Sequence, residues 1–521
     1  MGRAGMGLSP GRGWGTQETG TACLHGVGTL AGVREGDPED CSMIRSRVTI
    51  ASLYAALAVT TAASADWPNL SGNAAQNGLS AATGPSSATG SAVRWTRSDM
   101  TCLISWIPIV EGNRVFTVRQ TYAQAPYDPP PGEARVHCLD LATGATLWTF
   151  DCPFEPGDWT TVVYGARNGR VFVGRGGNGA SSAARIHCLN AATGAVLWVS
   201  ADEVRTGSYD GVAFMDNGDP IFACNTEMRR IDAQTGATAW FVSRTCSVSG
   251  TCGPARDGDA IYVDEVAPGG QRISRFSATT GQRLYGSQTM PGFLNQCSPF
   301  CAPGGLVFYL RASNEGPSVD LFYAFRDTGT GFQLLWTAPA RTEPFARHAV
   351  TPDGGVTMVS PEGRLQVRDQ QTGALRAETA ASILNASGFS SSMVTVDARG
   401  TIFHNNSNGA GGQNADLRAF TPVLVQSWRT TIAGMSQGGP SLAADGSLVV
   451  AGTGIVRRYW TAPPCVPADL NCDGVVNGDD LGIMLGAWGP CITGPPTCRA
   501  DLDGNGVVNA DDLGRLLAAW T

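Results

Sequence analysis

Two twelve-residue segments near the C-terminus carry side-chain oxygens at regular offsets. They read DLNCDGVVNGDD from residue 469 and DLDGNGVVNADD from residue 501, with Asp or Asn at positions 1, 3, 5, 9 and 12 and a glycine at position 6. A hard cation such as calcium takes roughly six to eight oxygen ligands from such a loop, including the main-chain carbonyl at position 7. We therefore expect two calcium ions. The candidate ligands are Asp469, Asn471, Asp473, Val475, Asn477 and Asp480 in the first loop, and Asp501, Asp503, Asn505, Val507, Asn509 and Asp512 in the second.

Helices that leave the two loops must hold these ligands in place. After each loop, apolar residues recur at i, i+3, i+4 and i+7, which is typical of one face of a helix. They are Leu481, Met484, Leu485 and Trp488 after the first loop, and Leu513, Leu516, Leu517 and Trp520 after the second. We expect these two stripes to pack against each other as a core. The residues ahead of each loop are rich in proline, which argues against a helix there.

A calcium loop followed by a helix, duplicated over residues 469–521 and with aspartate at position 12, resembles the type I dockerin family. The resemblance implies a small all-α calcium-binding module whose duplicated helix binds a cohesin, often on a scaffold used in polysaccharide degradation. Loop positions 10 and 11 commonly contribute to partner choice in that family. Here they are Gly478-Asp479 and Ala510-Asp511 in place of the usual hydroxyl pair, and a proline-rich linker at 461–468 precedes the module.

Residues 93–460 carry a different pattern, a short phrase with a Thr-Gly turn between two strands. Clear copies are HCLDLATGATLW at 137–148, HCLNAATGAVLW at 187–198, RIDAQTGATAW at 230–240 and FSATTGQRLY at 276–285, and weaker copies begin at 324, 367 and 417. A second signal, a glycine turn before β-branched or aromatic residues, recurs at Gly112, Gly169, Gly218, Gly258, Gly304, Gly354, Gly400 and Gly446. Four-stranded units of this length stack radially, which predicts an all-β, eight-bladed β-propeller.

The two signals differ by one copy, because only seven Thr-Gly phrases follow the eight glycine turns. The last blade, ending near GIVRRYW at 454–460, therefore lacks an outer strand. The strand AVRW at 92–95 can supply it. Such a closure would leave no exposed sheet edge in that blade.

The repeated phrase resembles the PQQ-binding-like β-propeller repeat with its LDaxTGxxxW signature, and DWPNLSGNAAQNG at 66–78, within an N-terminal segment of residues 66–92, is similar to the start of that family. The resemblance implies that Trp148, Trp198, Trp240 and Trp336 pack between blades. Quinoprotein dehydrogenases of the wider family carry two adjacent cysteines beside the cofactor. This sequence has neither adjacent cysteines nor a C-x-x-C-H haem motif, so we expect no PQQ and no catalysis, as in outer-membrane assembly factors of the same repeat class.

The N-terminus predicts export. Residues 43–65 carry two arginines, an apolar stretch and the small residues Ala63-Ser64-Ala65, which is typical of a secretory signal peptide, and residues 1–42 are interpreted as a leader ahead of the true start at Met43. We expect a mature chain without a membrane span, secreted, at the cell surface or in the periplasm. Cysteines pair in such a compartment. The nearest pairs in sequence are Cys246 with Cys252, Cys297 with Cys301, and Cys491 with Cys498.

The composition excludes several chemistries. All 36 basic residues are arginine, which removes every lysine-dependent mechanism. The net charge of −8 and the lack of a basic cluster argue against nucleic acid as a partner. We expect a secreted, non-enzymatic propeller that binds a glycan or protein, with a calcium-dependent tail that attaches to a cohesin-like or cell-surface partner. The alternative is a carbohydrate-active or PQQ-dependent enzyme delivered by the same tail.

Overall fold

The computed structural model describes most of the chain after residue 65. The described ranges are 66–100, 107–120, 133–153, 160–176, 182–206, 211–224, 226–245, 253–291, 298–311, 319–341, 343, 346–384, 390–408, 415–432, 438–452, 454–462, 466–471, 476–491 and 498–520. The predicted leader and signal peptide lie outside these residues.

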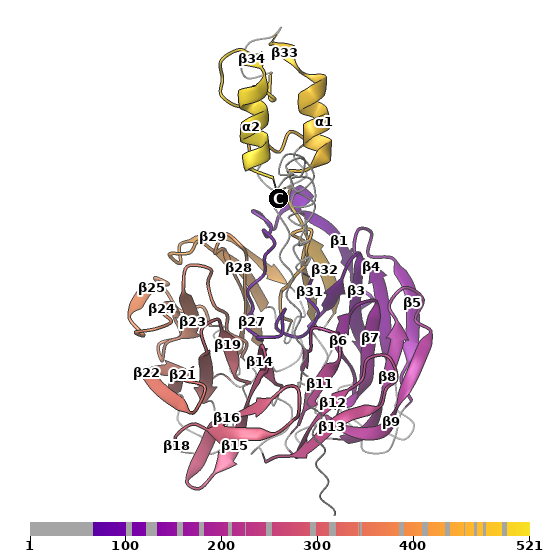
Figure 1. The fold of residues 1–521 in the computed structure, drawn as a ribbon, viewed down its shortest axis with the longest axis vertical. Coiled ribbons are helices and arrows are strands. Elements are labelled where there is room, and N and C mark those ends of the chain that lie inside the picture. Colours follow the sequence, from indigo (N-terminus) through magenta and orange to yellow (C-terminus); the bar gives the residue numbers. More distant parts are fainter. Residues whose placement is uncertain are drawn as a thin grey trace, which may run out of the picture. The chain divides into compact units, whose positions relative to one another are not determined.

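The described strands form eight antiparallel sheets that are the blades of a β-propeller, as the repeats predict (Figure 1). The first four blades are β2 (Ile109–Glu111), β3 (Arg114–Gln120), β4 (Ala134–Asp140) and β5 (Thr146–Asp151); β6 (Thr160–Arg167), β7 (Arg170–Gly176), β8 (Ser182–Asn190) and β9 (Val196–Thr206); β10 (Val212–Phe214), β11 (Pro220–Ala223), β12 (Glu227–Ile231) and β13 (Thr238–Ser243); β14 (Ala255–Asp257), β15 (Ala260–Ala267), β16 (Gly270–Ser277) and β17 (Arg283–Gly286), with β18 (Met290–Pro291) beside β16. The last four are β19 (Phe300–Ala302), β20 (Leu306–Arg311), β21 (Val319–Asp327) and β22 (Phe332–Arg341); β23 (Gly355–Val359), β24 (Leu365–Asp369) and β25 (Leu375–Glu378); β26 (Ser390–Val396), β27 (Ile402–Asn408), β28 (Ala415–Phe420) and β29 (Gln426–Ile432); β30 (Ser441–Leu442), β31 (Leu448–Gly452), β32 (Ile455–Tyr459) and β1 (Val93–Arg97). In the sixth blade, Val350 makes an isolated bridge to Val356 at the inner position.

Burial follows the position of a strand in its blade. The inner strand β6 is buried along almost its whole length, whereas the outer strand β5 alternates between exposed and half-buried residues. The eight predicted glycine turns all have positive φ, between 56° and 95°. Residues with a Cβ rarely adopt that conformation, so glycine is the residue that these turns require.

The last blade closes the ring in the predicted way. Strand β1 pairs antiparallel with β32 and is the outer strand of that blade, with Val93 opposite Tyr459. N-terminal and C-terminal parts of the propeller sequence therefore share one sheet. The pairing covers the strand edge that β32 would otherwise expose.

Aromatic side chains connect six of the blades to the blade that follows, as the family resemblance implies for Trp148, Trp198, Trp240 and Trp336. The Trp148 Nε1 group donates a hydrogen bond of 3.0 Å to the carbonyl of Ala191 in the next blade, and its ring lies over Gly194. The same contact recurs for Trp95 with Leu141, Trp198 with Ala233, Trp240 with Ala278 and Trp336 with Gln370. In the fourth blade Tyr285 takes this place, and its hydroxyl donates to Asp327 Oδ1 at 2.6 Å. In the seventh blade, Trp428 Nε1 donates instead to the carbonyl of Pro85 in the N-terminal segment, at 3.3 Å.

The N-terminal segment from Trp67 to Ser80 crosses the inner strands of successive blades. It begins with a pair of main-chain hydrogen bonds between Trp67 and Val110, and Asn69 Nδ2 reaches the carbonyl of Val212 at 3.0 Å. Its main-chain or side-chain partners, in blade order, are Val110, Ala166, Val212, Arg256, Cys301, Val350 and Val396. One short segment thus ties seven blades together.

Two of the cysteine predictions can be compared with the structure. Cys491 and Cys498 form a disulfide bond, as predicted. The pairing of Cys297 with Cys301 is wrong, because Cys301 is a free, buried thiol on an inner strand, with its Sγ 3.7 Å from the carbonyl oxygen of Ala75. The pair Cys246 and Cys252 lies outside the described residues.

The C-terminal module contains the helices α1 (Gly478–Gly486) and α2 (Ala510–Ala518), which lie side by side in Figure 1, and a short strand pair, β33 (Gly489–Pro490) with β34 (Val507–Val508). Its core is formed by Ala468, Leu470, Val476, Met484, Ala500, Val508 and Leu516. Neither of these helices, nor any other among the described residues, is long and apolar enough to cross a bilayer.

Candidate metal centre

The second predicted loop gathers three carboxylates at one point. Oxygens of Asp501, Asp503 and Asp512 all lie within 4.8 Å of one another. No arginine pairs with any of the three among the described residues, and the sequence has no lysine to do so. Three like charges this close repel one another, and a divalent cation relieves that repulsion. The residues present therefore fit calcium.

Backbone geometry in this loop follows its sequence. The Asp501 carboxylate accepts hydrogen bonds from the main-chain nitrogens of Gly504, Asn505 and Gly506 at 2.8 to 3.1 Å. Gly504 and Gly506 have φ values of 76° and 89°. The chain therefore turns tightly around the carboxylate at position 1, as the glycine at position 6 predicts.

The aspartates at position 12 connect each loop to its helix. Asp512 is fully buried, and its Oδ1 accepts from the main-chain nitrogens of Leu502 and Asp503 while its Oδ2 accepts from that of Asn509. Asp480 is held in the same way in the first loop. Burial alone would raise the pKa of Asp480, but these N–H donors outweigh it and hold that pKa below its ordinary value.

Asparagine at position 9 caps the helix in both copies. Asn477 Oδ1 accepts from the Asp479 nitrogen and Asn509 Oδ1 from the Asp511 nitrogen, each at 2.7 Å. With the aspartate at position 12 they form a capping box, which satisfies N–H groups at the start of the helix. At this loop position, a ligand often reaches calcium through a water.

The remaining predicted ligands differ in how far they converge. Asp469 is fully buried, and its carbonyl accepts from Arg499 Nη2 at 3.3 Å. Asn505 Nδ2 donates to Asp503 Oδ2 at 2.9 Å, and the Val507 carbonyl accepts from Asn509 Nδ2 at 3.3 Å. Asp473 and Val475 lie outside the described residues. The structure thus places the second loop more completely than the first.

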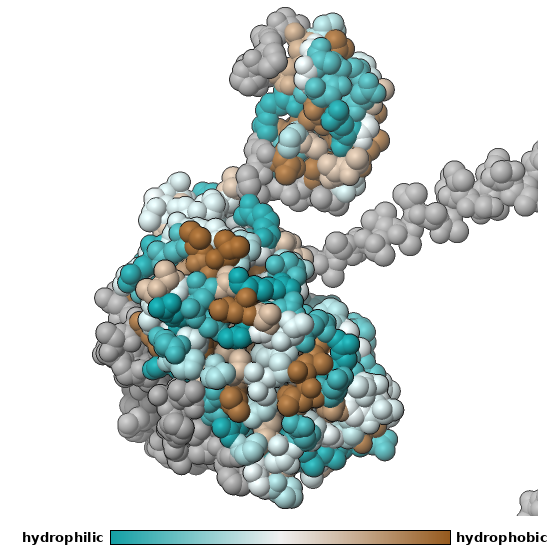
Figure 2. All heavy atoms as spheres, turned by 90° about the vertical axis from the view of Figure 1, so that its left-hand side faces the viewer, coloured by the Kyte–Doolittle hydropathy of each residue, from teal (hydrophilic) through white to brown (hydrophobic). Residues whose placement is uncertain are grey.

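The expected core role of the two apolar stripes is only half right. Met484 and Leu516 are fully buried, and Leu481 and Leu513 pack against them. The other halves of the stripes are exposed: Leu485 by 54%, Trp488 by 48%, Leu517 by 52% and Trp520 by 44%. Both helices have nine residues and end before their tryptophan, so the helical period no longer directs that ring to the core. Hydrophobic side chains of the module reach its surface in Figure 2.

A buried polar network in the propeller was not found from the sequence. Ser392 Oγ donates to Glu343 Oε1 at 2.9 Å and lies 3.0 Å from His404 Nε2, and His348 Nε2 is 3.8 Å from Glu343 Oε2. Burial raises the pKa of Glu343 to about 7 and lowers the pKa of His348 to about 4. The four residues come from separate segments without a shared motif, so only the fold brings them together.

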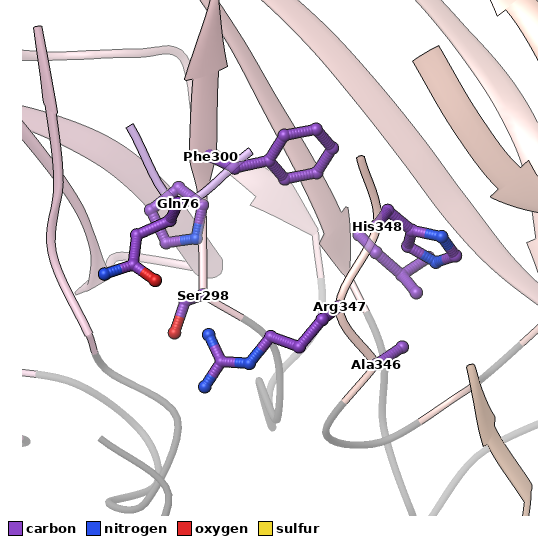
Figure 3. A pocket seen from close by; sticks show the side chains of 8 residues that line it. Gln76, Ser298, Phe300, Ala346, Arg347 and His348 are labelled. Carbon is purple, nitrogen blue, oxygen red and sulfur yellow. The ribbon is translucent and has the colours of Figure 1, made fainter. Parts of the chain in front are cut away.

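Arg347 lines two small cavities of the propeller. One is lined by Gln76, Ser298 and His348, and Figure 3 shows Arg347 extending toward Ser298 while the His348 ring points away. The other is lined by Trp67 and Thr395. Each holds about 10 Å³, which is room for a single water.

The ring of eight interlocked blades defines a propeller of the PQQ-like repeat class. The model of the family described as outer membrane protein assembly factor BamB matches residues 132–378 and 183–459, so the chain belongs to that family. No curated protein matches the sequence.

Solved structures of two alcohol dehydrogenases and of BamB are similar to this chain. Quinohemoprotein alcohol dehydrogenase from Comamonas testosteroni is 12% identical, with a TM-score of 0.52 over 82% of this chain and 87% of that one. The quinohemoprotein alcohol dehydrogenase ADHIIG from Pseudomonas putida HK5 is 13% identical, with a TM-score of 0.51 over 77% and 81%. BamB from Moraxella catarrhalis is 14% identical, with a TM-score of 0.47 over 71% and 99%. At these identities the likenesses to the two dehydrogenases show the fold alone, and they do not decide whether this chain is an enzyme.

Proposed function

We propose that this chain is an exported, non-enzymatic propeller whose residues 469–521 form a dockerin-like, calcium-ordered module for attachment to a cohesin-like protein. The observation that carries the proposal is the duplicated loop sequence, whose second copy brings oxygens of Asp501, Asp503 and Asp512 within 4.8 Å of one another. Calcium that binds only the folded module adds its binding free energy to folding. The module would therefore attach the propeller only where calcium is present.

Exposed apolar side chains on both helices support a docking role. Leu485 and Leu517 occupy equivalent places in the two copies and are each about half exposed, and a tryptophan follows each helix. Aromatic residues surrounded by smaller apolar ones are the usual anchors of protein interfaces. A cohesin-like partner is the occupant to which we commit. The propeller would then present its own surface, to a glycan or a protein, at the place where the tail attaches.

The test is binding of the full chain to a panel of purified cohesin domains, measured by calorimetry with calcium and again with a chelator. We expect binding to at least one domain in calcium only, and a loss of tenfold or more for Leu485→Ala with Leu517→Ala, since each buried leucine contributes about 1.5–3 kcal/mol. Leu147→Ala with Leu197→Ala is the matched control, because these leucines are 46% exposed on β5 and β9 of the propeller. Binding that persists in chelator, or no binding to any domain, would refute the docking role.

An enzymatic function is the second candidate, because two of the solved structures with this fold are named as alcohol dehydrogenases. Adjacent cysteines are absent from the sequence, which speaks against it. Dye-linked oxidation of alcohols after addition of PQQ and calcium to the full chain distinguishes the two. Release of sugars from polysaccharides tests the carbohydrate-active form of the same alternative.

A further inference from the structure

The disulfide bond of the C-terminal module lies beside the second calcium loop. Cys491 follows β33, Cys498 precedes Asp501 by three residues, and both are half-buried against the core of the module. The residues between them lie outside the described part of the chain. Because both sulfur-bearing residues are partly exposed, a small reductant has access to the bond.

Each half of the disulfide contacts a different part of the loop. The Cys491 nitrogen donates to the carbonyl of Gly506, at loop position 6, over 2.9 Å. The Asp501 nitrogen, at loop position 1, donates to the carbonyl of Cys498 over 3.3 Å. Cys491 Sγ itself is 3.8 Å from Asp501 Oδ2. The disulfide therefore connects the two residues that hydrogen-bond to loop positions 1 and 6.

The strand pair β33–β34 also connects the disulfide to loop position 7. Strands β33 and β34 place Gly489 opposite Val508 and Pro490 opposite Val507. Val507 is the residue whose main-chain carbonyl is the predicted calcium ligand. Asp501 Oδ2 in turn accepts from the Gly506 nitrogen at 2.8 Å, so positions 1, 6 and 7 are held as one unit.

We propose that the Cys491–Cys498 disulfide presets the second loop for calcium, so that reducing it weakens this site while the first loop keeps its affinity. The inference rests on the proposed function, because it needs the loop to bind calcium. A loop that is ordered before the ion arrives loses less conformational entropy on binding. Even the short ring that this disulfide closes removes enough chain entropy for roughly a tenfold or larger change in calcium affinity.

The redox step is an ordinary thiol–disulfide exchange. A dithiol reductant breaks the S–S bond and is itself oxidised to a disulfide, while Cys491 and Cys498 take up two electrons and two protons and become thiols. In an oxidising compartment the bond persists and the second site is strong. Under reducing conditions the module would keep one strong site.

The experiment is a calcium titration of the full chain by calorimetry, for the oxidised wild type and for Cys491→Ser with Cys498→Ser. Each is measured with and without a dithiol reductant. The reductant on the serine variant is the control for the other cysteines, among them Cys472 in the first loop. We expect two sites in the oxidised wild type, one site weakened about tenfold in the variant, and no further change in the variant on reduction.

The outcomes separate this inference from the proposed function. Two sites of unchanged affinity in the variant would overturn the role of the disulfide and leave calcium binding intact. Loss of both sites in the variant would overturn the assignment to the second loop. No calcium binding by the oxidised wild type would overturn the proposed function, and with it this inference.

Discussion

The contact between a tryptophan and the glycine of the next blade allows a sharp test of how the ring is held together. Gly194 has a φ of 74°, and a Cβ at that position would lie 2.7 Å from the Trp148 ring. Gly169 in the same blade has a φ of 73°, with nothing within 4 Å of such a Cβ. The two glycine-to-alanine substitutions therefore differ mainly in whether the new methyl group contacts the tryptophan ring.

The expected magnitudes follow from this difference. Gly169→Ala should lower the free energy of unfolding by about 1–2 kcal/mol, which is the backbone strain of a residue with a Cβ in the left-handed region. Gly194→Ala should add about 1–3 kcal/mol of overpacking against the ring. In a Trp148→Ala background this additional loss should disappear.

Equilibrium unfolding in urea, followed by far-UV circular dichroism, measures these differences without depending on tryptophan emission. The same loss of stability for both glycine variants would refute the interlock. So would an additional loss for Gly194→Ala that persists when Trp148 is alanine, because the methyl group would then be meeting something else.

Three further predictions concern the tail, the buried network and the N-terminal segment. Asp473→Ala with Asp503→Ala should unfold the tail and leave the propeller intact. The check is circular dichroism of the wild type on chelation, which should show a loss of helical signal while the main calorimetric transition stays unchanged. Unchanged helicity would contradict this prediction. Burial raises the pKa of the Glu343 carboxyl from 4.5 to about 7. The native state therefore binds the carboxyl proton more tightly than the unfolded state does. The stability that protonated Glu343 contributes is fully present below about pH 4.5 and is lost as the pH rises through about 7. Glu343→Gln should therefore gain stability relative to the wild type between about pH 5 and about pH 8, by up to about 3 kcal/mol; a pH-independent difference would show that Glu343 is ionised throughout. Asn69 is buried and donates to Asn73 and Val212, so Asn69→Ala should lower the free energy of unfolding by about 1–3 kcal/mol, against little change for the exposed Asn113→Ala in the same urea assay.

Much of the propeller could be predicted from the sequence, because its turns demand particular residues. All eight glycine turns have the expected positive φ, and the missing outer strand is supplied by β1. The copy at 417–428 shows why the repeated phrase is difficult to recognise in some blades. At 417–428 the Thr-Gly glycine is replaced by Leu424, which nevertheless has a φ of 61°. The fold imposes the turn even where the sequence does not favour it.

Contacts between distant segments could not be predicted in this way. The path of Trp67 to Ser80 across the inner strands and the meeting of Glu343 with Ser392 depend on the closed ring, and no local pattern marks them. The cysteine pair 297 and 301 was proposed from proximity in sequence alone. Cys301 lies on the inner strand β19, whose three residues are all buried, and its thiol is free there.

In the C-terminal module, loop spacing was more informative than hydrophobic periodicity. The spacing of the predicted ligands identified the three carboxylates that converge, those of Asp501, Asp503 and Asp512. The same periodicity that places Met484 and Leu516 in the core also assigned the two tryptophans to it. A small core between two nine-residue helices has room for only part of each stripe.

A calorimetric calcium titration of the full chain tests the central claim most directly. We predict two bound ions in the wild type, and their loss in Asp469→Asn with Asp501→Asn, which removes a charged ligand from each loop. Asp479→Asn with Asp511→Asn is the matched control, because these exposed aspartates at position 11 are not ligands and should leave both sites in place. No bound calcium in the wild type, or binding that survives the change at positions 469 and 501, would contradict the account.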